Sequence, residues 1–308
     1  MSGANMDATC DALRQLFVLR PEGEGMLRNE MGKRHWQPPA NLSNHSTRFY
    51  PSREQLFDDL YFDRHASPYG DLKPYTGSEA HRVLSEYPSS AQRHSRLILN
   101  RVKSSLSRRP QLIVEVGSFI GSGTVHVWGK LAREKSVDWP TAWRRQSETT
   151  QTVDSSRPIV LCVDPWQGDL LMRLERGPGA VFETFGHMRG RVFPKLGATF
   201  MRRILTQGLS DTIYPLPLPS LTAARLLYLL GYKVDVIYLD SAHERGETAA
   251  EFFLWYQLLR PGGVILGDDF SGFPAVRKDI SLAARCFGAR IDIFARNQNQ
   301  WIIRKPDT

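Results

Sequence analysis

Carboxylates and a histidine follow two of the apolar, strand-like runs of this sequence. Asp240 comes directly after one run and His243 three positions later, whereas Asp268 and Asp269 come directly after the next run. Two neighbouring strands of a parallel sheet lie about 4.8 Å apart and end at the same sheet edge, so these side chains converge if the two runs are neighbours. Three converging carboxylates repel one another unless some are protonated or a cation neutralises them. The pattern therefore predicts a divalent metal, Mg²⁺, held by Asp240, Asp268 and Asp269.

A metal at this edge would bind a hydroxyl group, lower its pKa and aim the oxygen at an electrophile. His243 stands close enough to Asp240 to take the released proton, which makes it the candidate catalytic base. Two alternatives stay open: the carboxylates cap the following helices and contact a bound molecule without metal, and His243 has only a structural role.

A glycine-rich segment, Glu-Val-Gly-Ser-Phe-Ile-Gly-Ser-Gly at 115–123, follows the first strand-like run and leads into a helix. Its glycines let the backbone approach a ligand where a Cβ atom would collide. Their order, GxxxGxG, differs from the GxGxxG that binds a dinucleotide pyrophosphate, which disfavours a nicotinamide or flavin enzyme. A glycine-rich turn without a ligand is the alternative.

Two further polar residues end the second and third runs. Asp164 could accept hydrogen bonds from a ribose diol, or it could simply begin a turn with Pro165. Ser220 could cap the helix that follows it and also face an adenine; the cap is the favoured single role.

The elements that must position these residues form an alternating pattern. After residue 110, short β-branched runs alternate with helical stretches, as in a parallel sheet covered on both faces. The fold class is therefore α/β, a doubly wound, mostly parallel sheet of seven strands. The predicted strands are Leu112 to Val116, Ile159 to Val163, Thr212 to Leu216, Val234 to Leu239, Val264 to Leu266, Arg290 to Ala295 and Gln300 to Ile303.

The first third of the chain lacks this alternation of strand-like and helical stretches. Residues 1–50 are expected to be flexible or irregular, and residues 51–110 to form a mainly helical extension that includes an acceptor lid, ahead of a domain at 111–308. Within the extension, Leu97, Ile98 and Val102 give an apolar helix side. Residues 136–157 are expected to be a surface insertion, and residues 166–200 a movable cover.

The motifs after residue 110 resemble those of class I S-adenosylmethionine-dependent methyltransferases. The Glu-x-Gly-x-x-x-Gly-x-Gly segment is similar to their first motif. Asp268-Asp269 and the Leu-Asp-x-x-His segment at 239–243 resemble the metal-dependent sugar O-methyltransferases of the macrocin and mycinamicin type. Catechol O-methyltransferases are more distant, because they have Asp-Asn and a lysine at these two places.

The resemblance implies an enzyme that transfers a methyl group from S-adenosylmethionine to a hydroxyl of a sugar or another small molecule. It implies that the donor is bound by one set of residues, namely Glu115, Gly117, Ser118, Gly121, Asp164, Ser220 and Asp240. Glu115 would organise the loop and contact the methionine ammonium.

Composition limits the other possibilities. The chain has a formal charge of +8 and paired arginines, which keeps an RNA or protein methyltransferase as the alternative, although the pairs form no continuous basic stripe. A non-catalytic protein that retains the pocket is a third hypothesis. Three scattered cysteines indicate neither a disulfide framework nor a zinc site, and no apolar stretch is long enough for a membrane span, so a cytoplasmic protein is expected. A homo-oligomer is compatible with the sequence.

Overall fold

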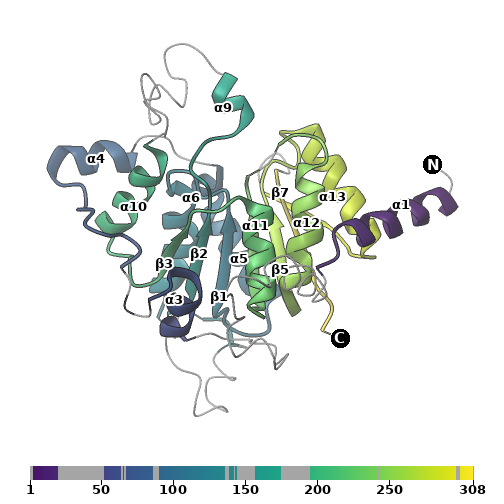
Figure 1. The fold of residues 1–308 in the computed structure, drawn as a ribbon, viewed down its shortest axis with the longest axis horizontal. Helices are drawn as coiled ribbons and strands as arrows, with labels where there is room; N and C mark the ends of the chain where they lie inside the picture. The colour runs from purple at the N-terminus through teal and green to yellow at the C-terminus, as the bar shows by residue number, and fades with distance from the viewer. Residues whose placement is uncertain are drawn as a thin grey trace, which may run out of the picture.

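The computed structural model describes residues 3–19, 52–63, 65, 67–85, 90–135, 139–141, 143, 157–174, 195–241, 243–295 and 299–307. Its centre is a seven-stranded sheet in the order β3-β2-β1-β4-β5-β7-β6 (Figure 1). The strands are β1 (Leu112–Val116), β2 (Ile159–Val163), β3 (Ile213–Leu216), β4 (Val234–Leu239), β5 (Leu259–Gly267), β6 (Asp292–Phe294) and β7 (Gln300–Arg304).

The sheet is parallel from β3 to β5, and only β7 runs antiparallel to its neighbours β5 and β6. The order reverses between β1 and β4, which places a topological switch point at the carboxyl ends of these two strands. The predicted fold class, a doubly wound and mostly parallel seven-stranded sheet, is confirmed.

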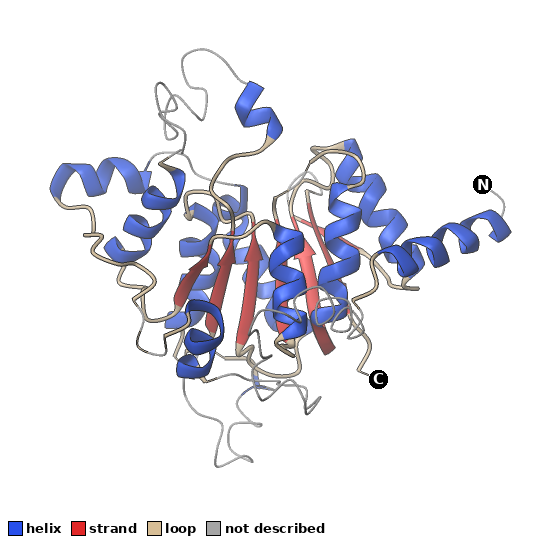
Figure 2. Ribbon diagram, in the orientation of Figure 1, coloured by secondary structure: helices blue, strands red, loops and turns tan. Residues whose placement is uncertain are grey.

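Helices cover both faces of the sheet (Figure 2). One face packs against α11 (Ser220–Leu229), α12 (Glu247–Leu258) and α13 (Pro274–Cys286), together with α3 (Arg53–Tyr61) and α1 (Gly3–Leu16). The other packs against α5 (Ser90–Ser105), α10 (Leu196–Thr206), and the helical run made by α6 (Ser122–Thr124), the π-helical turn η1 (Val125–Gly129) and α7 (Lys130–Arg133). The remaining helices are α4 (Gly77–Ser85) and α9 (Leu170–Leu174), and α9 lies beyond the carboxyl ends of the parallel strands (Figure 1).

Strand residues alternate between these two layers, as the period of a β-strand requires. In β1, Leu112, Val114 and Val116 join the core on the α11–α12 side, whereas Ile113 joins the core on the α5–α10 side. All five β1 residues are buried, which explains why the run is apolar almost throughout. Glu115 is the exception, and its burial makes it a residue that the site must explain.

The N-terminal region departs from the expectation in two ways. Residues 3–16 form helix α1 rather than an irregular segment, and a disulfide joins Cys10 of α1 to Cys286 of α13. The expectation of no disulfide was wrong because it relied on spacing along the chain; the two cysteines are 276 residues apart and the fold brings them together. Residues 20–51 lie outside the described residues.

Helix α5 belongs to the sheet layers. Ile98 and Val102 are buried in the core on that face, as predicted, but Leu97 is 46% exposed, which corrects its assignment to the apolar side. Trp139 and Trp143 of the expected surface insertion are also buried, and the Trp143 indole donates a 3.0 Å hydrogen bond to the carbonyl of Leu106. These two tryptophan side chains therefore lie in the core rather than on the surface.

Among the helices of the described residues, none combines the length and the apolar character that crossing a bilayer requires.

Candidate functional site

A cleft of about 750 Å³ opens at the carboxyl ends of β1, β2, β3 and β4. It lies at the switch point of the sheet, where open α/β sheets bind their ligands. Five of the residues predicted from the sequence line it: Gly117, Asp164, Ser220, Asp240 and His243. Elements from four different strands thus bring these residues to one place.

Gly117 marks the point where the ends of β1 and β4 come closest. Its φ is +86°, and a Cβ atom built on it would lie 2.1 Å from the carbonyl oxygen of Asp240. The Gly117 amide also donates a 2.9 Å hydrogen bond to the carbonyl of Val163 in β2. Only a residue without a side chain permits this approach, so the glycine has a definite structural reason.

The loop after β2 is tied to the glycine-rich loop through Asp164. One carboxylate oxygen accepts a 2.7 Å hydrogen bond from the Phe119 amide, and the other accepts a 2.6 Å hydrogen bond from the Trp166 amide. The Trp166 indole then donates to the carbonyl of Phe119 at 2.6 Å. Burial raises the pKa of Asp164 to about 6, although the two amides favour its charged form. Each oxygen keeps a lone pair for a hydroxyl in the cleft.

Glu115 faces the core on the α5–α10 side. Its carboxylate accepts hydrogen bonds from the hydroxyl of Thr124 and from the indole of Trp128, the latter at 3.1 Å. Burial raises its pKa to about 7. The predicted organising role agrees with these contacts to the helix after the loop. Its contact with a donor ammonium stays a prediction, because Glu115, like Ser118 and Gly121, is not among the described residues that line the cleft.

Ser220 does not cap α11, contrary to the favoured expectation. The N-cap position is Pro219, and the Ser220 hydroxyl instead accepts a 2.9 Å hydrogen bond from the Trp255 indole. Nearby, the Ser241 hydroxyl lies 2.8 Å from both carboxylate oxygens of Glu251. Glu251 is buried at the cleft wall, and burial raises its pKa to about 7. This network joins the loops after β3 and β4 to α12.

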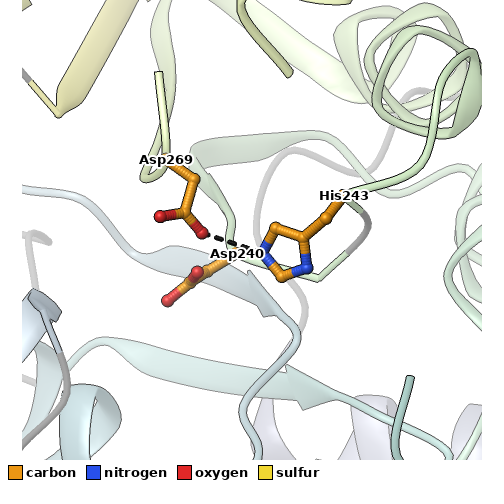
Figure 3. A group of neighbouring side chains, drawn as sticks. All are labelled: Asp240, His243 and Asp269. Carbon is orange, nitrogen blue, oxygen red and sulfur yellow. Dashed lines mark hydrogen bonds and ion pairs between the residues drawn. The ribbon is translucent and has the colours of Figure 1, made fainter. Parts of the chain in front are cut away.

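The acidic group at the ends of β4 and β5 contains Asp240, His243 and Asp269 (Figure 3). One ligand atom from each side chain lies within 4.8 Å of the others. The Nε2 atom of His243 is 2.8 Å from Oδ2 of Asp269, while its other ring nitrogen points away from the two carboxylates (Figure 3). The ring stacks on Phe273 with 4.3 Å between centroids.

The other predicted metal ligand, Asp268, makes different contacts. Its Oδ1 accepts hydrogen bonds from the Asp269 amide and from the side chain of Asn299. Burial and the charges of Asp268 and Asp269 raise the pKa of Asp240 well above its usual range. The crowded carboxylates therefore favour a proton on Asp240 or a bound cation. Metal binding by Asp268 stays a prediction.

His243 is flanked by a second carboxylate that the sequence did not single out. Its buried Nδ1 lies 3.4 Å from Oδ2 of Asp169, within ion-pair range although without the alignment of a hydrogen bond. Burial by itself would lower the pKa of His243, but the contacts with Asp169 and Asp269 outweigh it and raise the pKa to about 10. In this arrangement the ring is a cation between carboxylates.

Three site residues were thus missed from the sequence, and two of them left some signal. Glu251 is an isolated carboxylate within the apolar run 249–256 of α12, which is a sign of a buried acid. Asp169 follows Asp164 by five positions in the same loop, at the predicted cover. Asn299 gave no signal, because only the pairing of β7 with β5 brings it beside Asp268.

Comparison with known proteins gives one family match and a set of similar solved structures. A model of the methyltransferase domain family matches residues 114–270. No curated protein matches the chain. Among solved structures, an O-methyltransferase from Bacillus cereus in complex with SAH is 16% identical, with 82% of this chain and 96% of that chain covered and a TM-score of 0.44. The O-methyltransferase TomG from Streptomyces achromogenes is 11% identical, with 80% and 95% covered and a TM-score of 0.44.

The family match begins within β1, includes the cleft-lining residues and the acidic group, and ends directly after Asp269. It therefore covers half of the chain and the residues at the switch point of the sheet. On this match, the chain belongs to the methyltransferase domain family.

Proposed function

We propose that this protein transfers the methyl group of S-adenosylmethionine to a hydroxyl of a small molecule, with help from a divalent cation. The observation that supports it most is the composition of one cleft. Gly117 and Asp164 line the cleft after β1 and β2, and Asp240 and His243 line it after β4. A donor nucleoside and a hydroxyl acceptor would thus share a single space.

The donor side is suited to a nucleoside. Asp164 would accept hydrogen bonds from the two ribose hydroxyls with its remaining lone pairs, since its amide contacts already fix both oxygens. Ser220 lies on the wall after β3, where an adenine would sit. Gly117 would let the methionine portion pass close to the backbone.

The acidic side would receive the acceptor. In the reaction, the acceptor oxygen forms a bond to the methyl carbon while the carbon–sulfur bond breaks, and the hydroxyl proton must go to a base. His243 is the proposed base. Its Nε2 lies 2.8 Å from Asp269, and the carboxylates beside the ring favour its protonated form. His243 could therefore act as a base only after a cation had replaced it as the partner of Asp269 and the ring had lost its extra proton.

The residues present fit a divalent cation. Asp240 and Asp269 offer carboxylate oxygens within 4.8 Å of one another, and the nitrogen of His243, the proposed base, lies equally near. Carboxylate oxygens suit Mg²⁺, whereas a nearby imidazole makes Mn²⁺ equally suitable. A bound cation would supply the positive charge that stabilises the deprotonated acceptor oxygen.

Calorimetric titration of S-adenosylmethionine and S-adenosylhomocysteine tests the proposal, with and without Mg²⁺ or Mn²⁺. We expect micromolar binding to the wild-type protein and a loss of about 100-fold or more in Asp164→Ala, equivalent to about 2.7 kcal/mol. Asp211→Ala is the matched control, because Asp211 is an exposed carboxylate paired with Arg157 just before β3. Absence of binding to the wild-type protein under all conditions would refute the proposed function.

A further inference from the structure

Asp169 divides its two carboxylate oxygens between two partners. Oδ1 accepts a 2.7 Å hydrogen bond from the amide of Met172, in the first turn of helix α9. Oδ2 lies 3.4 Å from Nδ1 of His243. The first contact fixes the side chain of Asp169, and the second sets it against the imidazole.

The loop that contains Asp169 is itself held in place. It begins at Asp164, which is bound by the amides of Phe119 and Trp166, and the indole of Trp166 returns to the Phe119 carbonyl. Asp169 is part-buried, with 19% of its side chain exposed, and it lines the same cleft as Asp164. The loop thus connects the donor side of the cleft to the ring of His243.

His243 needs such a contact because its own segment is short. The ring follows the end of β4 by only a few residues and stacks on Phe273. Stacking fixes the plane of the ring but leaves it free to flip by about 180° in that plane, which puts a ring carbon in the place of each nitrogen. A carboxylate at Nδ1 selects the orientation in which Nε2 faces Asp269 and Asp240, as drawn in Figure 3.

We infer that Asp169 is the positioning residue of His243: it holds Nδ1 so that Nε2 faces the Asp240–Asp269 pair. The inference deepens the proposed function, on which the catalytic use of His243 rests. The contact between the two side chains, however, can be tested without any substrate.

The test uses ¹⁵N-histidine-labelled protein and the ring ¹⁵N signals in long-range ¹H–¹⁵N spectra. The eight histidines are resolved by comparison with His243→Gln, which removes one set of signals. Asp169→Asn keeps a helix-capping oxygen for the Met172 amide but removes the negative charge at Nδ1. We expect the Nδ1 and Nε2 signals of His243 to move and broaden in this variant, because the ring loses its preferred protonation and orientation.

Two further variants separate positioning from other effects. Asp169→Ser keeps a helix cap but is too short to reach His243, so it should reproduce the spectrum of Asp169→Asn; Asp169→Glu should restore part of the wild-type signal. Asp164→Asn should leave the His243 signals in place while weakening S-adenosylhomocysteine binding. His243 signals in Asp169→Asn that match the wild type would overturn the inference.

The two proposals fail in distinguishable ways. If wild-type protein binds no S-adenosylhomocysteine, the proposed function is wrong, and the ring spectra still decide whether Asp169 positions His243. If binding occurs and Asp169→Asn loses it as strongly as Asp164→Ala, while the ring signals stay unchanged, Asp169 is a donor-pocket residue and the inference is wrong.

Discussion

The two sides of the cleft differ in how completely the chain satisfies its own polar groups. On the donor side, Asp164 accepts hydrogen bonds from two backbone amides, and Glu115, in the adjoining core, accepts hydrogen bonds from Thr124 and Trp128. On the acidic side, Asp240 faces Asp268 and Asp269, and their charges help raise its pKa. The donor side is therefore formed by the protein alone, whereas the acidic side is built to receive positive charge.

This difference has an energetic consequence. Hydrogen bonds within the protein already fix the donor side, so a change in its backbone geometry should reduce stability and donor binding. Repulsion on the acidic side should make it sensitive to ions and pH instead. Each of the following changes probes one side.

The largest effect is expected at the closest backbone approach. Gly117→Ala would place a Cβ atom 2.1 Å from the carbonyl oxygen of Asp240, at a φ of +86°. The left-handed strain and the collision together should reduce the free energy of unfolding by about 3–5 kcal/mol. Urea unfolding and calorimetry with S-adenosylhomocysteine would measure the loss of stability and of donor binding.

Gly208→Ala is the matched control for that substitution. Gly208 also has a positive φ, +60°, but a Cβ atom there would meet nothing within 4 Å. It should cost only about 1–2 kcal/mol, from backbone strain alone, and leave donor binding unchanged. Equal losses in the two variants would mean that the collision at Gly117 has no consequence.

The next effect concerns the buried carboxyl of Glu251. Its pKa is raised by burial from 4.5 to about 7, so the folded state holds its proton more tightly than the unfolded state does. Its contribution to stability is full below pH 4.5 and is lost as the pH rises from 4.5 to about 7. Because one pKa unit corresponds to about 1.4 kcal/mol, the loss is at most about 3 kcal/mol.

Glu251→Gln removes this ionisation while keeping one oxygen for Ser241. We expect urea unfolding to show that the variant is about 2–3 kcal/mol more stable than the wild type at pH 8. At pH 4 the two proteins should have the same free energy of unfolding. Glu79→Gln, at a partly exposed carboxylate paired with Arg202, should change stability by less than about 0.5 kcal/mol at either pH. A gain that does not depend on pH would contradict the argument.

The acidic side should respond to cations. Mn²⁺ at 100 times its dissociation constant should stabilise the wild-type protein by about 2.7 kcal/mol, since it binds only the folded state. Asp269→Asn should abolish most of this gain while leaving S-adenosylhomocysteine binding intact. The control Asp292→Asn, at a half-exposed carboxylate paired with Arg101, should keep the full gain in stability. Thermal unfolding with and without Mn²⁺ measures the difference, and an equal gain in all three proteins would exclude the site.

Sequence patterns predicted the strand ends at which several of the site residues lie. β1, β2 and β4 begin and end as predicted, because a strand buried on both faces is a short apolar run with a sharp end. Gly117, Asp164 and Asp240 follow such ends directly, so their place in the cleft could be inferred. The order of the sheet could be inferred only through the resemblance to a family.

Side-chain direction and contacts between distant segments could not be predicted in this way. The local sequence pattern does not predict that the Glu115 carboxylate accepts a hydrogen bond from Trp128. Nor does it predict that the Ser220 hydroxyl accepts one from Trp255 instead of capping α11. The disulfide between α1 and α13 and the contact of Asn299 with Asp268 join segments with no sequence relation. These contacts depend on packing, which a one-dimensional pattern does not contain.

The smallest expected effect tests whether the donor side is preorganised. Trp166→Phe removes the 2.6 Å hydrogen bond from the indole to the Phe119 carbonyl while keeping an aromatic ring against Phe200. Trp143→Phe is the control, because it removes a comparable 3.0 Å bond to the Leu106 carbonyl, away from the residues that line the cleft. Each variant should lose about 1 kcal/mol of stability in urea unfolding.

Only Trp166→Phe should also weaken S-adenosylhomocysteine binding, by about 3–5-fold or about 0.6–1 kcal/mol, because the glycine-rich loop would lose one of the bonds that set its shape before the ligand arrives. Unchanged binding in Trp166→Phe would show that Asp164 alone holds this loop, and would reduce the difference between the two sides to that single carboxylate.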